Sequence, residues 1–209
     1  MILYVVRHGE SQANVGLAAH ADSSLTGLGQ EQARCVAKFL ADKPIAAILS
    51  SPFRRAIETA EPLCRQLGMK AELCPLVSEW SNEFYVHMKT FVGEPLSAVL
   101  ANYDCTAAPA EPVTGPWWPR WPESFEALKN RVIRAGEQLA GRFPGQEGVA
   151  VFTHGAMFAG LEAWLAGELE PLASDELTVQ NAVVTIGRAG NGEKQLLCRR
   201  ESSHLSSLV

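Results

Sequence analysis

The sequence predicts an α/β fold, a three-layer α/β/α sandwich whose mostly parallel central sheet carries one antiparallel edge strand. Three short apolar runs carry this prediction: ILYVV at 2–6, AAILS at 46–50 and VAVFT at 149–153. They are continuous rather than alternating, which is typical of strands buried on both faces of a parallel sheet. Stretches with helical periodicity separate the runs, which favours right-handed crossovers between parallel strands.

Three helices are expected between these strands. The first covers 26–41 and begins at a threonine that can cap it. The second covers 55–67 and ends at Gly68, and Pro62 within it predicts a kink or a break. The third covers 124–142. The first and third each carry an apolar stripe at helical spacing, made up of Leu28, Val36, Phe39 and Leu40 in the first and of Phe125, Leu128, Val132 and Leu139 in the third.

The last part of the chain predicts an antiparallel edge. Residues 181–200 read as two strands joined by a glycine-rich turn at 190–192. Residues 106–124 are dense in proline and tryptophan and cannot form a regular helix. Long loops in compact domains are usually functional, so we expect a lid or cap around 80–123 within a single domain of residues 1–209.

Composition narrows the function classes. The 18 Lys and Arg residues against 23 Asp and Glu give a formal net charge of −5, which does not favour binding to nucleic acid. The five cysteines, at 35, 64, 74, 105 and 198, lack paired spacing and are interpreted as reduced thiols. The first apolar run is too short for a secretory leader, and no run approaches the roughly 18 apolar residues that span a bilayer. These features predict a cytoplasmic protein without a membrane partner.

Basic side chains and imidazoles follow all three apolar runs, in the segments RHGE at 7–10, PFRR at 52–55 and HG at 154–155. Because ligands bind at the carboxyl ends of the strands in open α/β sheets, these segments are expected to share one site. Guanidinium groups match phosphate oxygens, and each charge-assisted hydrogen bond is worth about 1.5–3 kcal/mol. A neutral imidazole could also attack phosphorus, and nearby arginines would oppose its protonation. The residues therefore predict phosphoryl chemistry.

Three motifs resemble those of the histidine phosphatase superfamily, branch 1, whose members have the phosphoglycerate mutase-like fold. They are RHGE at 7–10, SSPFRRAIETA at 50–60 and THG at 153–155. Further matches occur in the expected order along nearly the whole chain, at Asn14, Leu25, Thr26, Gly29, Gln32, Ala33, Glu123, Ser124, Arg131 and 203–205. One such tetrapeptide alone is a weak signal, whereas three motifs at three strand ends are specific.

The resemblance implies catalytic roles for five residues. His8 would be the nucleophile that becomes phosphohistidine, and Arg7, Arg55 and His154 would grip the phosphoryl oxygens. Arg55 is chosen over its neighbour because the family's arginine directly precedes an alanine. The general acid would be Glu79, which would protonate the departing oxygen and then activate water.

The stretch EWSNEF at 79–84 departs from the commoner family pattern after the acid, and Glu83 is the alternative to Glu79. A Glu-Trp pair is closer to the branch that resembles the T-cell signalling suppressor phosphatases.

The implied substrate-binding set comprises Arg7, Asn14, Thr26, Arg55, His154 and Gly155. Asn14 and Thr26 are equally typical of turns and helix caps. Glu10 is expected to be structural, and His20, His87 and His204 receive no catalytic role, although His87 could line the substrate end of the pocket.

We expect a metal-independent phosphomonoesterase that hydrolyses a small-molecule phosphate ester through His8 and needs no cofactor. Zinc is disfavoured because the spacing lacks HExxH and adjacent arginines repel a dication. The first alternative is a cofactor-dependent phosphoglycerate mutase, although the stretch and insert that mark that branch are not recognisable. The second alternative is a non-catalytic module that binds a phospho-ligand. The sequence leaves open the substrate and the choice between a monomer and a homodimer.

Overall fold

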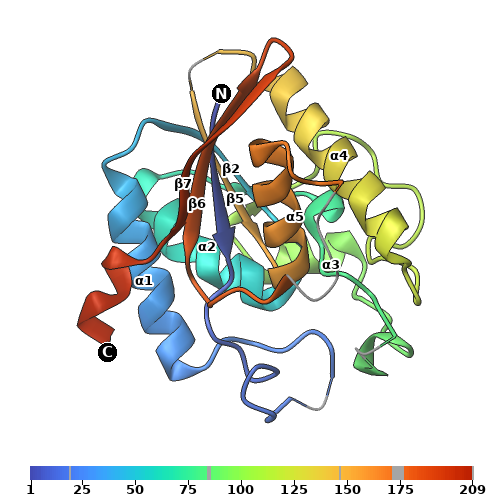
Figure 1. Ribbon diagram of the computed structural model, residues 1–209. Helices are drawn as coiled ribbons and strands as arrows, with labels where there is room; N and C mark the ends of the chain where they lie inside the picture. The colour runs from blue at the N-terminus through green and yellow to red at the C-terminus, as the bar shows by residue number, and fades with distance from the viewer. Residues whose placement is uncertain (19, 84–85, 146, 171–176, 209) are drawn as a thin grey trace.

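The computed structural model describes residues 1–18, 20–83, 86–145, 147–170 and 177–208. Within them, seven strands form one sheet in the order β4-β3-β2-β5-β1-β6-β7 (Figure 1). The strands are β1 (Ile2–Arg7), β2 (Ile45–Ser50), β3 (Ala71–Leu73), β4 (Thr106–Ala107), β5 (Gly148–Thr153), β6 (Val184–Gly190) and β7 (Glu193–Glu201). The first five run parallel to one another.

The antiparallel part of the sheet is a hairpin. Strand β6 pairs antiparallel with β1, and β7 pairs antiparallel with β6 and forms the edge. The turn between them places Asn191 and Gly192 at φ of 53° and 80°, in the left-handed region that asparagine and glycine tolerate best. The predicted antiparallel edge is therefore confirmed. It consists of two strands, with β6 next to β1 and β7 outermost.

Helices cover both faces of the sheet. They are α1 (Gly27–Ala41), α2 (Arg54–Leu67), α3 (Leu96–Asn102), α4 (Phe125–Arg142) and α5 (Gly155–Ala166). Side chains of α1 and α2 pack on one face, and those of α4 and α5 pack on the other, so that α1 and α4 lie on opposite sides of the sheet in Figure 1. The predicted three-layer α/β/α sandwich is confirmed.

The three predicted helices form where their caps and stripes indicate. The hydroxyl of Thr26 accepts a hydrogen bond from the Gly29 amide at 3.1 Å, and Ser124 caps α4 in the same way. Helix α2 ends at Gly68, which has φ of 65°. Of the kink or break predicted at Pro62, the break is wrong, because α2 continues through this residue and its apolar face is buried against the sheet and α1. That packing offsets the one hydrogen bond that proline removes.

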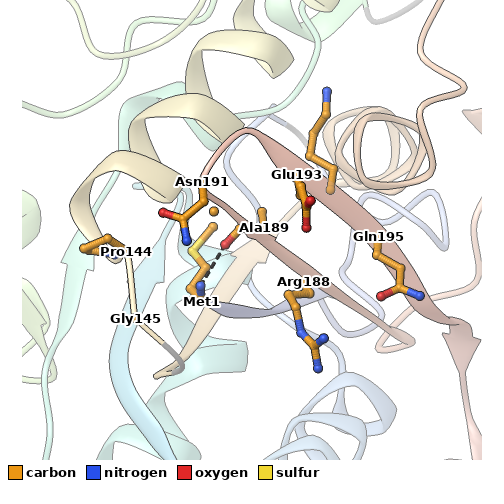
Figure 2. A pocket seen from close by; sticks show the side chains of 10 residues that line it. Met1, Pro144, Gly145, Arg188, Ala189, Asn191, Glu193 and Gln195 are labelled. Carbon is orange, nitrogen blue, oxygen red and sulfur yellow. Dashed lines mark hydrogen bonds between the residues drawn. The ribbon is translucent and has the colours of Figure 1, made fainter.

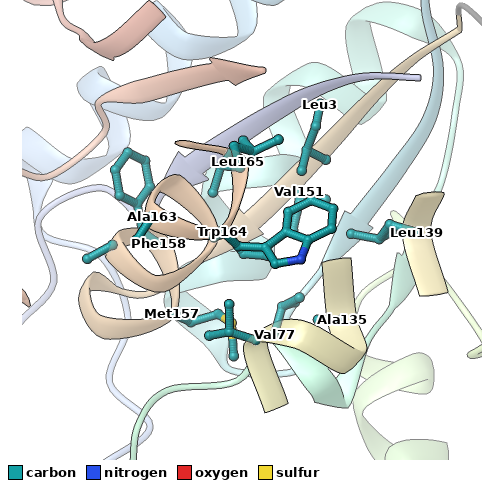
Figure 3. Close-up of a cluster of buried hydrophobic side chains, with 14 of the residues drawn as sticks. Leu3, Val77, Ala135, Leu139, Val151, Met157, Phe158, Ala163, Trp164 and Leu165 are labelled. Atoms are coloured by element: carbon teal, nitrogen blue, oxygen red, sulfur yellow. The ribbon is translucent and has the colours of Figure 1, made fainter. Parts of the chain in front are cut away.

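Helix α5 fills the core between α4 and the sheet (Figure 3). Its side chains are buried from Ala156 to Leu165, so the helix has no polar face and no amphipathic stripe to reveal it in the sequence. A Cβ atom on Gly136 of α4 would lie 2.6 Å from the indole of Trp164, and one on Gly160 would lie 2.5 Å from a methyl of Val132. Glycine at both positions lets α4 and α5 approach closely.

The five cysteines are free thiols, as predicted. Burial raises the pKa of Cys64 to about 12 and that of Cys74 to about 11, which keeps both protonated. No helix in the described part of the chain is long and apolar enough to cross a membrane.

Candidate active site

The carboxyl ends of β1, β2 and β5 meet at one edge of the sheet. Arg7 is in register with Thr153 on β5, and Ser50 on β2 is in register with Phe152. His8 and His154 directly follow β1 and β5, and α2 begins at Arg54, shortly after β2 ends at Ser50. The predicted convergence of the three motifs is therefore observed.

His8 presents an imidazole nitrogen without a hydrogen to this site. Its side chain is buried, and Nδ1 lies 2.7 Å from the carbonyl oxygen of Gly9. Because a carbonyl only accepts, Nδ1 carries the hydrogen in the neutral ring. Nε2 then holds the lone pair and accepts a hydrogen bond from Arg55 Nε at 3.2 Å.

Both site histidines are held neutral. Burial lowers the pKa of His8 well below its usual value of 6.5, and the positive charges of Arg55 and Arg7 lower it further, against the opposing hydrogen bond to Gly9. The pKa of His154 is also well below 6.5, first through burial and then through the charge of Arg55. A neutral His8 keeps its lone pair available near neutral pH.

Arg55 joins the parts of the site. It is 5% exposed, and besides its contact with His8 it donates from Nη1 to the carbonyl oxygen of Ala21 at 2.8 Å. Its Nη2 lies 3.8 Å from Oε2 of Glu79, and its guanidinium lies over the Phe53 ring, 4.8 Å from the ring centroid. These contacts place a charged fork beside the bare nitrogen of His8.

Its neighbour Arg54 points elsewhere. The Arg54 amide donates to Asp22 at 2.7 Å, and its guanidinium lies 3.1 Å from Glu94 and 3.6 Å from Asp22. The structure thus brings Arg55, and not Arg54, to His8, and phosphoryl binding by Arg55 stays a prediction.

Arg7 and the start of α5 lie side by side. A Cβ atom on Gly155 would lie 3.6 Å from Arg7 Nε, and Gly155 is the first residue of α5. Helix N-termini attract anions because their amide hydrogens have no partner within the helix. Arg7 and this helix end therefore offer positive potential to the same edge of the site.

His154 is the N-cap residue of α5 and is fully buried. Its Nε2 lies 2.8 Å from the hydroxyl of Ser51. Its Nδ1 has no hydrogen-bond partner among the described residues and lies 3.7 Å from Oε2 of Glu79. The ring centroid is 5.2 Å from that of His8, so the two imidazoles border one small space.

Glu79 completes this group from the loop after the short helix Pro75–Val77. Its carboxylate is nearly buried, and Oε1 accepts a hydrogen bond from the Trp80 amide at 2.9 Å. Oε2 faces both Arg55 and His154 at the distances given above. The alternative acid, Glu83, is exposed. Of the two carboxyl groups, the structure places Glu79 beside His8.

Arg131 holds the backbone that carries Glu79. Its guanidinium donates to the carbonyl oxygens of Leu76 at 2.9 Å, of Ser78 at 2.7 Å and of Glu79 at 3.2 Å. A nearly buried ion pair with Glu123 at 2.7 Å fixes the guanidinium. Sequence reasoning noted this pair only as a weak motif match, and nothing in its spacing indicated which loop it would hold.

Two predicted substrate contacts have structural partners. Thr26 caps α1 and donates to the Glu10 carboxylate at 2.7 Å. Asn14 is exposed, and its side-chain oxygen accepts from the Ser11 amide at 3.0 Å and from Asn181 at 3.2 Å. Substrate contact by Asn14 and Thr26 stays a prediction. Glu10 binds Thr26, in agreement with a structural role.

Three other residues support His8 or His154, and the sequence assigned none of them a role, although Ser51 and Thr59 lie within the motif at 50–60. Asn181 donates to the His8 carbonyl at 3.0 Å, and Thr59 accepts from the Gly9 amide at 3.0 Å. Ser51 is the hydroxyl partner of His154. Serine and threonine are common in strand ends and helices, so only their position in the fold shows what they contact.

Segments from 86–123 pack beside the site. Phe91 stacks on Phe53 at 5.2 Å between centroids, and Trp117 meets the same ring edge-on at 5.1 Å. Phe53 in turn lies edge-on to His154 at 5.1 Å. Trp117 is buried, and its indole donates to the Glu94 carbonyl at 2.7 Å. The proline- and tryptophan-rich stretch therefore packs around Phe53, one ring away from the site.

A pocket of about 360 Å³ adjoins this packing. It is lined by His20, Ala21, Asp22, Arg54, His87, Thr90, Phe91, Val92 and Glu94. Two of its lining residues contact residues of the site: the Ala21 carbonyl accepts a hydrogen bond from Arg55, and Phe91 stacks on Phe53. The pocket therefore lies next to the cluster of His8, Arg55 and His154. His87 lines this pocket, and its contact with a substrate stays a prediction.

A larger pocket of about 690 Å³ lies at the opposite end of β1 (Figure 2). Met1, Pro144, Arg188 and Asn191 border it, and the Met1 ammonium donates to the Ala189 carbonyl at 2.7 Å. None of the three motifs contributes to its lining, so of these two pockets the smaller one lies nearer the site.

One atom from each of His8, Glu79 and His154 lies within 4.8 Å of the others, a spacing that could hold a metal ion. The imidazole nitrogens of His8 are both engaged in hydrogen bonds, and Arg55 lies within 3.8 Å of the carboxylate. The charge of Arg55 opposes a dication at this position. The same charge favours an anion there.

Comparison with known proteins agrees with this geometry. The family model of the histidine phosphatase superfamily (branch 1) matches residues 3–201. A probable phosphatase of Schizosaccharomyces pombe is 32% identical over 216 residues, covering 98% of this chain and 71% of that protein. An adenosylcobalamin/alpha-ribazole phosphatase of Escherichia coli is 28% identical over 174 residues, or 80% of each chain.

A solved phosphoglycerate mutase from Bacillus anthracis superposes with a TM-score of 0.71 at 24% identity, covering 99% of this chain and 95% of the other, and so shares the fold. Sequence motifs, sheet topology and the family match over nearly the whole chain agree, and the chain belongs to the histidine phosphatase superfamily, branch 1.

Proposed function

We propose that this protein is a phosphomonoesterase that forms phosphohistidine at His8. The observation that carries the proposal is the state of His8: a neutral, buried imidazole whose bare Nε2 faces Arg55. A covalent intermediate divides a slow hydrolysis into two faster displacements.

In the first step, Nε2 of His8 attacks phosphorus and the bond to the ester oxygen breaks. Glu79, acting in its protonated form, gives its proton to the departing oxygen, so the leaving group departs as a neutral alcohol. Arg7, Arg55 and the start of α5 bind the phosphoryl oxygens, and their positive charge stabilises the transferring group.

In the second step, water attacks the phosphohistidine. The Glu79 carboxylate accepts a proton from the water as the new P–O bond forms and the P–N bond breaks. Inorganic phosphate leaves, His8 regains its lone pair, and Glu79 is again protonated for the next cycle. Proximity of the Glu79 carboxylate to His154 and Arg55, at 3.7 Å and 3.8 Å, supports this double role.

The leaving alcohol would occupy the pocket of about 360 Å³ beside Ala21 and Phe91. Its lining mixes charged, aromatic and aliphatic side chains, which suits a small polar alcohol. We infer that residues 80–123 act as a cap over this end of the site. The sequence also predicts a single domain of residues 1–209 and a location in the cytoplasm, and both are part of this proposal.

The reaction needs no metal in this proposal. Arg7 and Arg55 supply the positive charge that a metal ion would otherwise bring to the phosphoryl oxygens.

The test is phosphate release from a panel of phosphomonoesters, including p-nitrophenyl phosphate and 3-phosphoglycerate, with and without EDTA. The wild type should release phosphate at equal rates with and without EDTA, and His8→Gln should release none. His8→Gln, purified identically, also controls for a contaminating phosphatase. After rapid quenching in alkali, wild-type protein should contain phosphohistidine, an acid-labile adduct that the variant lacks.

Substantial hydrolysis by His8→Gln would refute the mechanism. Isomerisation of 3-phosphoglycerate faster than phosphate release would instead identify a mutase. Tight binding of vanadate without turnover of any ester would identify a binding module.

A further inference from the structure

The Ser51 hydroxyl is placed to control His154. Both residues are fully buried, and Ser51 Oγ lies 2.8 Å from His154 Nε2. Ser51 lies directly after β2, and its hydroxyl also accepts a hydrogen bond from the Phe53 amide at 3.3 Å. Since that amide can only donate, the Ser51 hydrogen needs another acceptor. Among the described contacts of this hydroxyl, the acceptor is His154 Nε2.

The opposite arrangement would be unfavourable twice. If His154 donated from Nε2, the buried Ser51 hydrogen would have no acceptor among the described residues, at a cost in free energy. Once Glu79 has given its proton to the leaving group, a bare Nδ1 would also face the Glu79 carboxylate, whose Oε2 lies 3.7 Å away. Two electron-rich atoms would then meet in a buried space, and a hydrogen on Nδ1 turns that contact into an attraction.

We propose that Ser51 is a positioning residue that fixes the tautomer of His154, so that Nδ1 carries a hydrogen and donates it to the phosphoryl group. His8 has the same hydrogen on Nδ1, but there the Gly9 carbonyl binds it, and bare Nε2 faces the site. The two imidazoles thus present opposite atoms to one space: a lone pair that attacks phosphorus and an N–H that binds its oxygen.

Nδ1 of His154 has no hydrogen-bond partner in the described structure, and the phosphoryl oxygen would supply one. This part of the inference rests on the proposed phosphatase function, whereas the tautomer itself does not.

Nitrogen NMR of 15N-histidine-labelled protein tests the tautomer without turnover. A bare imidazole nitrogen resonates far downfield of one that carries a hydrogen, and a hydrogen bond moves the bare signal back upfield. In the wild type, His154 should show a protonated Nδ1 and a bare, hydrogen-bonded Nε2, with its signals assigned by their loss in His154→Gln. A protonated Nε2 in the wild type would overturn the inference, and this measurement needs no Ser51 variant.

Ser51→Ala should let both tautomers of His154 form, so that its Nε2 signal moves upfield toward that of a protonated nitrogen and its Nδ1 signal moves downfield. It should also lower kcat/KM roughly tenfold, as expected for one buried hydrogen bond. Ser51→Thr, which keeps the hydroxyl, should restore both readouts in part. Ser50→Ala is the matched control, because Ser50 is equally buried and its hydroxyl donates to the Ser51 carbonyl at 2.9 Å. It should leave the His154 signals in place. An unchanged Nε2 signal in Ser51→Ala would refute the role of Ser51.

Addition of inorganic phosphate should shift the Nδ1–H signal of His154, because the hydrogen then binds a phosphate oxygen. An unchanged signal at saturating phosphate would refute the role of Nδ1 in binding. If the tautomer is as inferred but no ester is hydrolysed, the proposed function fails and the assignment of Ser51 stands. If esters are hydrolysed while His154 carries its hydrogen on Nε2, the proposed function stands and the assignment of Ser51 fails.

Discussion

Replacement of Arg55 by lysine tests the geometry of the site directly. The lysine keeps the positive charge but loses the planar fork that contacts His8 at 3.2 Å, Ala21 at 2.8 Å and Glu79 at 3.8 Å at once. An ammonium at the end of a flexible chain cannot reproduce these three directions. The substitution therefore separates the effect of charge from the effect of shape.

The expected loss follows from the bonds that the fork makes to a phosphoryl group. Charge-assisted hydrogen bonds contribute about 1.5–3 kcal/mol each, and lysine should lose the equivalent of one to two of them. A loss of about 3 kcal/mol corresponds to a fall in kcat/KM of roughly a hundredfold. The same weakening should appear in the inhibition constant of vanadate, because vanadate occupies the phosphoryl position without requiring turnover.

The assay is kcat/KM for p-nitrophenyl phosphate, with vanadate inhibition measured on the same preparations. Arg65→Lys is the matched control, because Arg65 lies on the same helix, has a side chain that is 77% exposed and pairs with Glu61 one turn earlier. It should change kcat/KM by less than about twofold. A fall of less than threefold in Arg55→Lys would show that the fork does not bind the reacting phosphoryl group.

Three further outcomes are expected. Glu79→Gln should lower kcat by roughly 10²- to 10⁴-fold, measured by steady-state phosphate release, because the amide cannot transfer a proton. Arg55→Met should move the acid limb of the kcat/KM profile upward in pH. The positive charge of Arg55 adds to the effect of burial in lowering the pKa of His8, so loss of this charge raises that pKa. Because His8 must be neutral to attack, activity is then lost at a higher pH. Gly29→Ala should lower the free energy of unfolding in urea by at least about 2 kcal/mol, because its Cβ would lie 1.9 Å from a backbone oxygen. Gly27→Ala, in the same helix with open space around it, should change the free energy by less than about 1 kcal/mol.

Each of these expectations has a contradicting result. Near-normal turnover in Glu79→Gln would move the acid elsewhere, with the exposed Glu83 as the next variant to test. An acid limb that stays in place in Arg55→Met would mean that the limb reports another group. Equal stability of the two glycine variants would show that the loop before α1 can move away from the helix at little cost.

Much of the fold could be predicted because local pattern and tertiary burial agree. The strands at 2–6, 46–50 and 149–153 are apolar apart from Ser50 and Thr153 at their ends, and they are the three neighbours at the centre of the sheet. Helices α1 and α4 carry one apolar stripe each, next to a cap residue in the sequence. Helix α5 could not be found in this way, because it is buried on all sides and its residues show no alternation between polar and apolar faces.

The sequence by itself determined which groups meet at the site: parallel strands end at one edge, so the residues after β1, β2 and β5 had to bring His8, Arg55 and His154 together. It did not determine the partners that give these groups their state. Glu79 reaches the site because Arg131 binds the carbonyls of its loop, and His154 is oriented by the Ser51 hydroxyl, which follows a different strand. Hydrogen-bond direction, burial and pKa depend on distances between segments far apart in the chain, and only the packed structure sets those distances.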